Sequence, residues 1–332
     1  MEVYNYIVEP KADMTRYFRN KDICFLDIET TGLNRRYDQI YLIGLLFFNY
    51  ETQNWNLKQI FAHNVKGERY VLEKLNDIIK GFDLIVTYNG NSFDLPFIYH
   101  RSRKYSIDTD ILDMDTFDIY RKIRAQKSYL ELENLKLKTI EEELGIYRED
   151  EYSGKDCIDL YYSYMNTGNE TLRNKILKHN YDDLYYLADI MEIFEYIEDI
   201  KSIRVPFGGD VIDIKIEDIL EIEDILKIHC RVSNANEHVD IIHYEDGFNM
   251  DWGKNDSLIV ELEFNKGMVT PTKGCSFINK ANIYAFKDLK DFSHFVVPRD
   301  IVLLKVEDRY EMKNIKYILA ALIKYVLTEQ NI

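Results

Sequence analysis

A short apolar run that ends in two acids constrains this chain more than any other segment. Residues 23–28 (ICFLDI) are apolar apart from Asp27, as in a central strand of a buried sheet, and residues 30–32 (TTG) end the run. Asp27 and Glu29 are two residues apart, so on a strand both side chains point to one face. Two like charges there repel each other and lose hydration, which a divalent cation or a bound proton would relieve. A solvated strand end, with a carboxylate capping the next turn, is the alternative.

A second strand leads to a third acid, Asp94. Residues 84–88 (LIVTY) are typical of a short strand, and residues 89–92 (NGNS) are typical of a turn. Pro96 follows Asp94 closely and suits the first turn of a helix. We therefore expect Asp94 near a helix N-terminus, beside the carboxyl end of a strand. Helix capping is the alternative to metal binding there.

The fourth acid lies on a long amphipathic helix that we expect over residues 170–198. Its buried face is an apolar stripe at helical spacing, formed by Leu184, Leu187, Met191, Phe194 and Ile197. His179 and Asp183 are four residues apart, so they share a face and can reach one centre. This spacing favours Asp183 over the adjacent Asp182. A purely structural histidine is the alternative for His179.

In chain order, the segments DIETTGL, YNGNSFD and HNYDD resemble the three motifs of the DEDD (DnaQ-like) 3′–5′ exonuclease superfamily. The similarity covers residues 20–198 and extends to the bacterial YprB-like ribonuclease-H-like group, where a stretch comparable to residues 135–164 follows the second motif. The resemblance implies a ribonuclease-H-like fold and two bound Mg²⁺ or Mn²⁺ ions. It implies that the metal ligands are Asp27, Glu29, Asp94 and Asp183.

The resemblance leaves the role of His179 between two alternatives, because many relatives have Tyr at this spacing and others have His one residue earlier. His179 would either orient the attacking water or deprotonate it. The same resemblance implies that Asn89 and the turn formed by Thr31, Gly32 and Leu33 hold the terminal nucleotide.

Basic residues follow the first two motifs and are candidates for a phosphate track. They are Arg35, Arg36, His100, Arg101, Arg103, Lys104, Arg121, Lys122, Arg124, Lys127, Lys136 and Lys138. Of these, we expect Lys138 to contact nucleic acid. Solvated helix faces are the alternative interpretation.

Composition argues against several classes of protein. The net charge of −16 and pI near 5.0 argue against a general basic coat for nucleic acid, although bound cations can supply positive charge locally. The four cysteines are scattered, which argues against a zinc site or a disulfide framework. No apolar run reaches the roughly 18 residues that a membrane span needs, and the N-terminus does not resemble a signal peptide. We expect a cytoplasmic protein with no membrane partner.

We expect an α/β fold with two domains. Residues 1–200 would form a ribonuclease-H-like domain with a mixed five-stranded sheet flanked by helices. Residues 209–332 would form a smaller α+β accessory domain of unknown role, with antiparallel strands and a C-terminal helix. The segment SIRVPFGGD, residues 202–210, is predicted to be a linker and turn between them.

Hydrophobic periodicity and turn residues predict further strands and helices in the first domain. The expected strands are 38–50, 54–62, 83–88 and 109–114, and the expected helices are 67–80, 93–104, 115–124 and 135–145.

The preferred function is metal-dependent 3′–5′ exonuclease activity on the 3′ end of single-stranded DNA or RNA, by a two-metal mechanism. A catalytically silent nucleic-acid-binding or scaffold module is one alternative, although clustered acids without metal carry an electrostatic cost. A structure-selective endonuclease is another, since ribonuclease-H-like sheets host several nuclease types. The position of Asn89 before Phe93 and Asp94 favours the exonuclease.

Overall fold

The computed structural model describes residues 1–148, 152–233, 240–253 and 255–330. The chain divides into two compact units. The first unit comprises residues 1–125 and 132–193, and the second comprises residues 126–131 and 194–332. Each is described by itself below.

The first unit is built on a mixed six-stranded sheet with the strand order β1-β4-β3-β2-β5-β6. Its strands are β1 (Glu2–Val8), β2 (Ile23–Thr30), β3 (Ile40–Asn49), β4 (Asn54–Phe61), β5 (Leu84–Thr87) and β6 (Asp115–Asp118). The pairs β1–β4, β4–β3 and β3–β2 are antiparallel, and the pairs β2–β5 and β5–β6 are parallel. The expected α/β class with a mixed, helix-flanked sheet is confirmed, and β1 adds one strand to the five expected.

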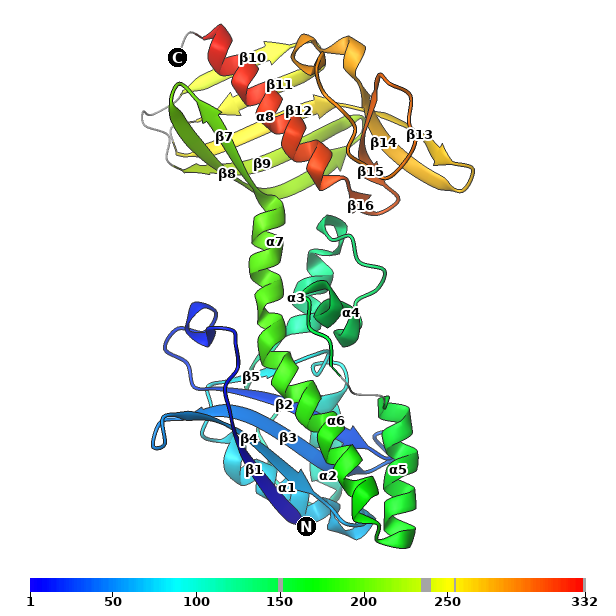
Figure 1. Cartoon of the computed structure of the whole chain (residues 1–332). Helices are drawn as coiled ribbons and strands as arrows, with labels where there is room; N and C mark the ends of the chain where they lie inside the picture. The colour runs from blue at the N-terminus through cyan, green and yellow to red at the C-terminus, as the bar shows by residue number, and fades with distance from the viewer. Residues whose placement is uncertain (149–151, 234–239, 254, 331–332) are drawn as a thin grey trace. The chain divides into compact units, whose positions relative to one another are not determined.

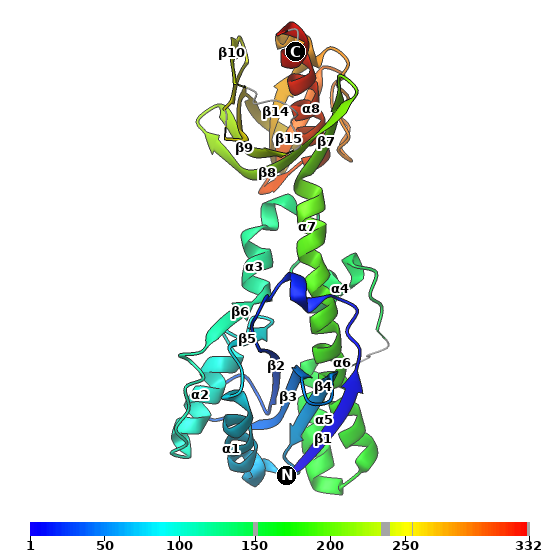
Figure 2. The ribbon, with the colours of Figure 1, turned by 90° about the vertical axis from the view of Figure 1, so that its left-hand side faces the viewer.

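Helices cover both faces of this sheet. They are α1 (Glu68–Ile79), α2 (Asp94–Lys104), α3 (Ile119–Ala125), α4 (Leu137–Glu143), α5 (Gly154–Thr167) and α6 (Glu170–Asp189). Helices α1 and α2 lie on one face, and the antiparallel pair α5 and α6 lies on the other (Figures 1 and 2). A capping box between Ser153 and Asp156 begins α5, Gly168 ends it with a positive φ of 65°, and Asn169 caps α6. The sequence therefore encodes this helical hairpin locally.

Two elements of the first unit differ from expectation. The last strand is β6, not residues 109–114, and the following helix α3 begins only at Ile119. The long helix expected over residues 170–198 is interrupted by a 3-10 turn at Ile190–Glu192 and continues as α7 (Ile193–Lys201). The other expected strands and helices of this unit are present, with ends shifted by a few residues at most.

The second unit contains two antiparallel sheets and one long helix among its described residues. The sheet orders are β10-β11-β12-β9-β8-β7 and β13-β14-β15-β16. The strands are β7 (Ser202–Phe207), β8 (Asp210–Ile222), β9 (Ile225–Ser233), β10 (Ile241–Glu245), β11 (Phe248–Trp252), β12 (Ser257–Glu263), β13 (Asn265–Thr270), β14 (Lys273–Asn279), β15 (Ile301–Val306) and β16 (Arg309–Tyr310). The helix is α8 (Met312–Glu329), whose apolar stripe is buried in the core that both sheets share. The antiparallel strands and the C-terminal helix are confirmed.

The prediction of a linker at residues 202–210 is wrong in its first part. Residues 202–207 form β7, in which Ile203 and Val205 are buried and alternate with exposed Arg204. Gly208 and Gly209, both with positive φ, turn the chain from β7 into β8. Pro206 lies on an edge strand, where a missing N–H costs no ladder hydrogen bond.

A search of the described residues found no helix that combines the length and apolar character of a membrane span.

Candidate active site

The central strand β2 places the first two acids. It lies between β3 and β5, and Asp27 and Glu29 both project from the face that α6 covers. Glu29 is buried and Asp27 is half-buried, while the intervening Ile28 belongs to the apolar core on the opposite face. The alternation of a strand therefore presents both carboxylates to one helix.

Asp94 is the first residue of α2, and its side chain contacts the backbone of β2. Its Oδ1 accepts a hydrogen bond of 3.2 Å from the backbone N–H of Ile28, between the two acids of β2. The N-cap position of α2 belongs to Phe93, which makes no side-chain cap. The buried Asp94 carboxyl has its pKa raised to about 7, mainly because burial disfavours its charge, although backbone hydrogen bonds lower the pKa in part.

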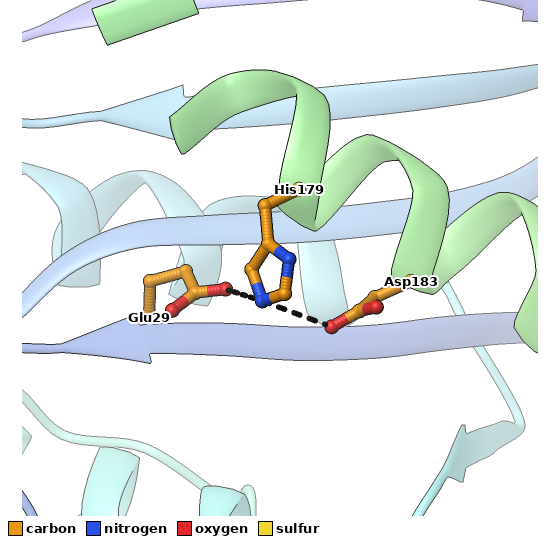
Figure 3. A group of neighbouring side chains, drawn as sticks. All are labelled: Glu29, His179 and Asp183. Carbon is orange, nitrogen blue, oxygen red and sulfur yellow. Dashed lines mark ion pairs between the residues drawn. The ribbon is translucent and has the colours of Figure 1, made fainter. Parts of the chain in front are cut away.

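Helix α6 brings His179 and Asp183 to Glu29. Nε2 of His179 lies 3.7 Å from Oε1 of Glu29 and 3.6 Å from Oδ2 of Asp183. Figure 3 shows the imidazole between the two carboxylates. One ligand atom from each residue lies within 4.8 Å of the other two, so this trio has the spacing of a metal site. Asp182, the neighbour of Asp183, instead pairs with Lys178.

The charges on these acids act on one another. The pKa of Asp27 is raised well above its usual value, first by burial and then by Asp183, Glu29 and Asp94. Three segments that are far apart in sequence therefore bring four carboxyl groups within electrostatic range. A divalent cation at this cluster would relieve their repulsion.

Two polar residues that the motifs do not single out also contact the site. Asn180, on α6, donates a hydrogen bond of 2.7 Å from Nδ2 to Oδ2 of Asp27. Arg148 pairs with the carboxylate of Asp183, and its Nε lies 3.0 Å from Oε2 of buried Glu141. A signal for Asn180 exists in the sequence, because it lies one turn before Leu184 on the buried stripe of α6.

The residues expected to hold nucleic acid lie on loops and on α4. Thr31 is buried, and it closes the loop after β2 through hydrogen bonds with Gln39. Gly32 lies beside Asp38, where an added Cβ would lie 2.4 Å from the Asp38 carboxylate. Leu33 is 84% exposed, so a large apolar side chain faces solvent just after the acids of β2. Lys138 is exposed on α4, about one helical turn before Glu141.

Asn89 lies in the loop after β5, and a buried acid shapes that loop. Asn89 is exposed and has a positive φ of 63°. Asp118, at the end of β6, accepts hydrogen bonds from the backbone N–H groups of Asn89 and Asn91, at 3.0 and 3.2 Å. Because β2, β5 and β6 are parallel, their carboxyl ends meet at one edge of the sheet. This geometry places the loops after β2 and β5 beside each other.

Two curated archaeal proteins match short segments of the chain. The DNA polymerase of Methanocaldococcus jannaschii is 34% identical over 67 residues, which is 20% of this chain and 4% of that protein. DNA polymerase 1 of Sulfurisphaera ohwakuensis is 36% identical over 62 residues, which is 17% of this chain and 7% of that protein. The chain thus spans only a small fraction of these curated relatives.

Solved structures are similar at low identity. The family B DNA polymerase of the archaeon Pyrobaculum calidifontis has a TM-score of 0.43 and 14% identity, over 54% of this chain and 25% of that chain. The zinc-bound complex of E. coli exonuclease I with single-stranded DNA has a TM-score of 0.33 and 13% identity, over 63% of this chain and 54% of that chain.

A family model matches a longer part of the chain than either curated protein does. The sequence model of the RNase_H superfamily, RNase_H_2, matches residues 24–195, which is more than half of the chain. The matched range begins in β2, ends just after α6, and contains all the acids described above. The chain therefore belongs to the RNase_H superfamily.

Proposed function

We propose that the chain is a metal-dependent nuclease that removes nucleotides from the 3′ end of single-stranded DNA or RNA. The observation that carries this proposal is the convergence of Glu29, Asp94 and Asp183 on Asp27, with His179 beside two of them. The order of the three acidic motifs, which resembles DEDD exonucleases, supports the 3′–5′ direction. We place the activity in residues 1–200 and treat residues 209–332 as an accessory domain.

The donor set fits Mg²⁺ or Mn²⁺. Carboxylate oxygens are the ligands these hard cations prefer, and the single imidazole of His179 is compatible with Mn²⁺. Asp27, Glu29, Asp94 and Asp183 would hold two such ions. When bound, the ions would supply positive charge to the scissile phosphate and acidify a bound water.

The side chains of the site have separable roles in this proposal. Asp27 projects from the central strand and would serve both ions. His179 is held between Glu29 and Asp183 and would orient the attacking water or accept its proton.

The loops at the carboxyl edge of the sheet would hold the terminal nucleotide. The turn Thr31, Gly32 and Leu33 follows the acids of β2 directly, and Asn89 lies in the neighbouring loop after β5. The exposed Leu33 offers an apolar surface for a base, and Lys138 offers a charge for a phosphate.

A cleavage assay on purified protein tests the proposal. Single-stranded DNA and RNA, labelled at the 5′ end, are incubated with Mg²⁺ or Mn²⁺ and with a chelator. A ladder that shortens from the 3′ end in a metal-dependent manner is the expected result. Internal cuts would instead indicate an endonuclease, and binding without cleavage would indicate a silent module.

Two isosteric variants link the activity to the acids. Asp27→Asn and Asp183→Asn should each abolish nearly all cleavage, because the amide supplies no charge to the metals. The melting temperature of Asp27→Asn in chelator should be equal to or slightly above wild type, since repulsion in the cluster is relieved. Wild-type cleavage by both variants would contradict the proposed site.

A further inference from the structure

Asp27 is held by a buried amide whose orientation the surrounding groups fix. Nδ2 of Asn180 donates to Oδ2 of Asp27 at 2.7 Å, and Oδ1 of Asn180 accepts from Nε2 of Gln59 at 2.8 Å. The same Nε2 donates to the backbone carbonyl of Leu177 at 2.8 Å. A carbonyl can only accept, so the amino group of Gln59 must face Leu177 and Asn180. Asn180 therefore turns its oxygen to Gln59 and its amino group to Asp27.

The pair Asn180 and Gln59 is fully buried, since both side chains have 0% exposure. Buried amides rarely lack partners, and water cannot replace these hydrogen bonds at such depth. Gln59 lies on β4 and Asn180 on α6, so the pair links β4, which lies two strands from β2, to the helix that carries His179 and Asp183. Asn180 therefore has a hydrogen-bond partner on each side, Asp27 and Gln59.

The backbone makes room for the amide at one position. Gly44 is the register partner of Asp27 on β3. An added Cβ at Gly44 would lie 2.4 Å from Oδ1 of Asn180 and 2.2 Å from Cδ1 of Leu184. Asn180 can cross over β3 to reach Asp27 only because residue 44 has no side chain.

We propose that Asn180, oriented by Gln59, is a positioning residue that holds one oxygen of Asp27 and leaves the other for metal. The inference rests on the proposed function, in which Asp27 is a metal ligand. Oδ2 of Asp27 accepts the hydrogen bond of Asn180, which leaves Oδ1 as the oxygen with more lone-pair capacity for a cation. Without the amide, the Asp27 carboxylate would be free to rotate, and it would present its oxygens to a cation in several orientations.

The expected effect is on metal binding and turnover, not on substrate binding. Loss of residues that orient metal ligands typically weakens metal affinity by roughly 10- to 100-fold. Asn180→Leu keeps a side chain branched at Cγ, with a somewhat larger volume, and removes both hydrogen bonds. Gln59→Leu leaves the contact to Asp27 but frees the amide of Asn180 to turn.

The test measures Mn²⁺ affinity by calorimetry and cleavage kinetics for four proteins: wild type, Asn180→Leu, Gln59→Leu and Asn76→Leu. Asn76 is the matched control. It lies on α1, away from the acids, and its amide donates a hydrogen bond of 2.9 Å to the backbone carbonyl of Asp108. We expect Asn180→Leu to weaken Mn²⁺ binding by about tenfold or more and to lower kcat with little change in KM. Gln59→Leu should show a smaller shift in the same direction, and Asn76→Leu should bind and cleave as wild type.

The outcomes separate this inference from the proposed function. If wild type binds Mn²⁺, Asp27→Asn does not, and folded Asn180→Leu keeps wild-type affinity and kcat, then the positioning role is wrong and the metal site stands. If Asn180→Leu does not fold, Gln59→Leu decides in the same way. If wild type binds no Mn²⁺ at all, the metal site and the inference both fail.

Discussion

Arg148 pairs with the carboxylate of Asp183, one of the acids proposed to bind metal. The Arg148 side chain is only 10% exposed, and Glu141, which is buried, holds it from the other side. The chain thus places a cation of its own against one metal ligand. A divalent ion at Asp183 and the guanidinium of Arg148 would then compete for the same carboxylate.

Replacing Arg148 should therefore strengthen metal binding. We expect Arg148→Gln to lower the Mn²⁺ dissociation constant by about threefold to tenfold, because a nearby positive charge is removed. Calorimetry in low salt gives the measurement. Lys178→Gln is the control, because Lys178 is also a cation beside the site but pairs with Asp182. Weaker Mn²⁺ binding by Arg148→Gln would show that Arg148 supports the metal site instead.

His179 should act on turnover more than on stability. If it orients or deprotonates the attacking water, His179→Ala should lower kcat by about 10²–10⁴-fold with little change in KM. His179→Tyr should retain appreciable activity, since the resemblance to DEDD exonucleases implies Tyr at this spacing. Rates are normalised to folded protein, and an unchanged rate per folded molecule of His179→Ala would assign His179 a structural role only.

The stability of the metal-free protein should depend on pH in a direction that the buried acids set. The pKa of Asp27 is raised well above normal by burial and neighbouring acids, and burial raises the pKa of Asp94 and of Glu141 to about 7. A carboxyl group whose pKa is higher in the folded chain than in the unfolded chain stabilises the fold at a pH below its unfolded pKa. This stabilisation is lost as the pH rises through the folded pKa. The melting temperature in chelator should therefore rise from about pH 8 to about pH 5.

Asp94→Asn provides the control for that profile. The variant should melt higher than wild type near pH 8 and should show a shallower dependence on pH, because one of the carboxyl groups with a raised pKa is gone. Saturating Mn²⁺ should reverse the slope for wild type, since metal binds the ionised acids. If the melting temperature of wild type in chelator did not change with pH, or rose with pH, the raised pKa values of the buried acids would be contradicted.

A buried ion pair supports the loop after β2. Arg101 donates to Glu68 from Nε at 2.7 Å and from Nη2 at 2.6 Å, and both side chains are fully buried. Glu68 also accepts the backbone N–H of Ile40 at 2.9 Å, and Arg101 donates to the carbonyl of Arg36 at 3.3 Å. Together they fix both the loop and the start of β3.

Breaking this pair should cost stability and substrate affinity. Arg101→Met leaves the Glu68 charge buried without its partner, so we expect a loss of about 3–5 kcal/mol in the free energy of unfolding. The loop after β2 should loosen, and KM for single-stranded nucleic acid should rise. Arg69→Gln, which breaks the exposed pair with Glu73, should change neither quantity appreciably. Denaturant titration and kinetics measure both effects.

The sequence predicts that these acids lie close together, because each acid lies on a regular element. Asp27 and Glu29 share a face through the period of a strand, and His179 and Asp183 share one through the period of a helix. The choice of Asp183 over Asp182 depends on that period alone, and the two side chains do face different partners.

Other features of the fold and the site depend on contacts between distant segments, and local sequence patterns do not predict such contacts. In β6, Asp115 and Asp118 are poor strand formers, and pairing with β5 extends them nonetheless. The orientation of Asn180 depends on Gln59, more than a hundred residues away in the chain. Arg148 lies just after α4, and no spacing rule connects it to Asp183.

Strand β1 has a practical consequence for handling the protein. Its seven residues pair with seven of the eight residues of β4, from Glu2 opposite Phe61 to Val8 opposite Trp55. Removing residues 1–8 would leave the N–H and C=O groups of β4 available to a strand from another molecule. A variant that lacks residues 1–8 should therefore self-associate on concentration, so affinity tags belong before an intact β1 or on the opposite terminus.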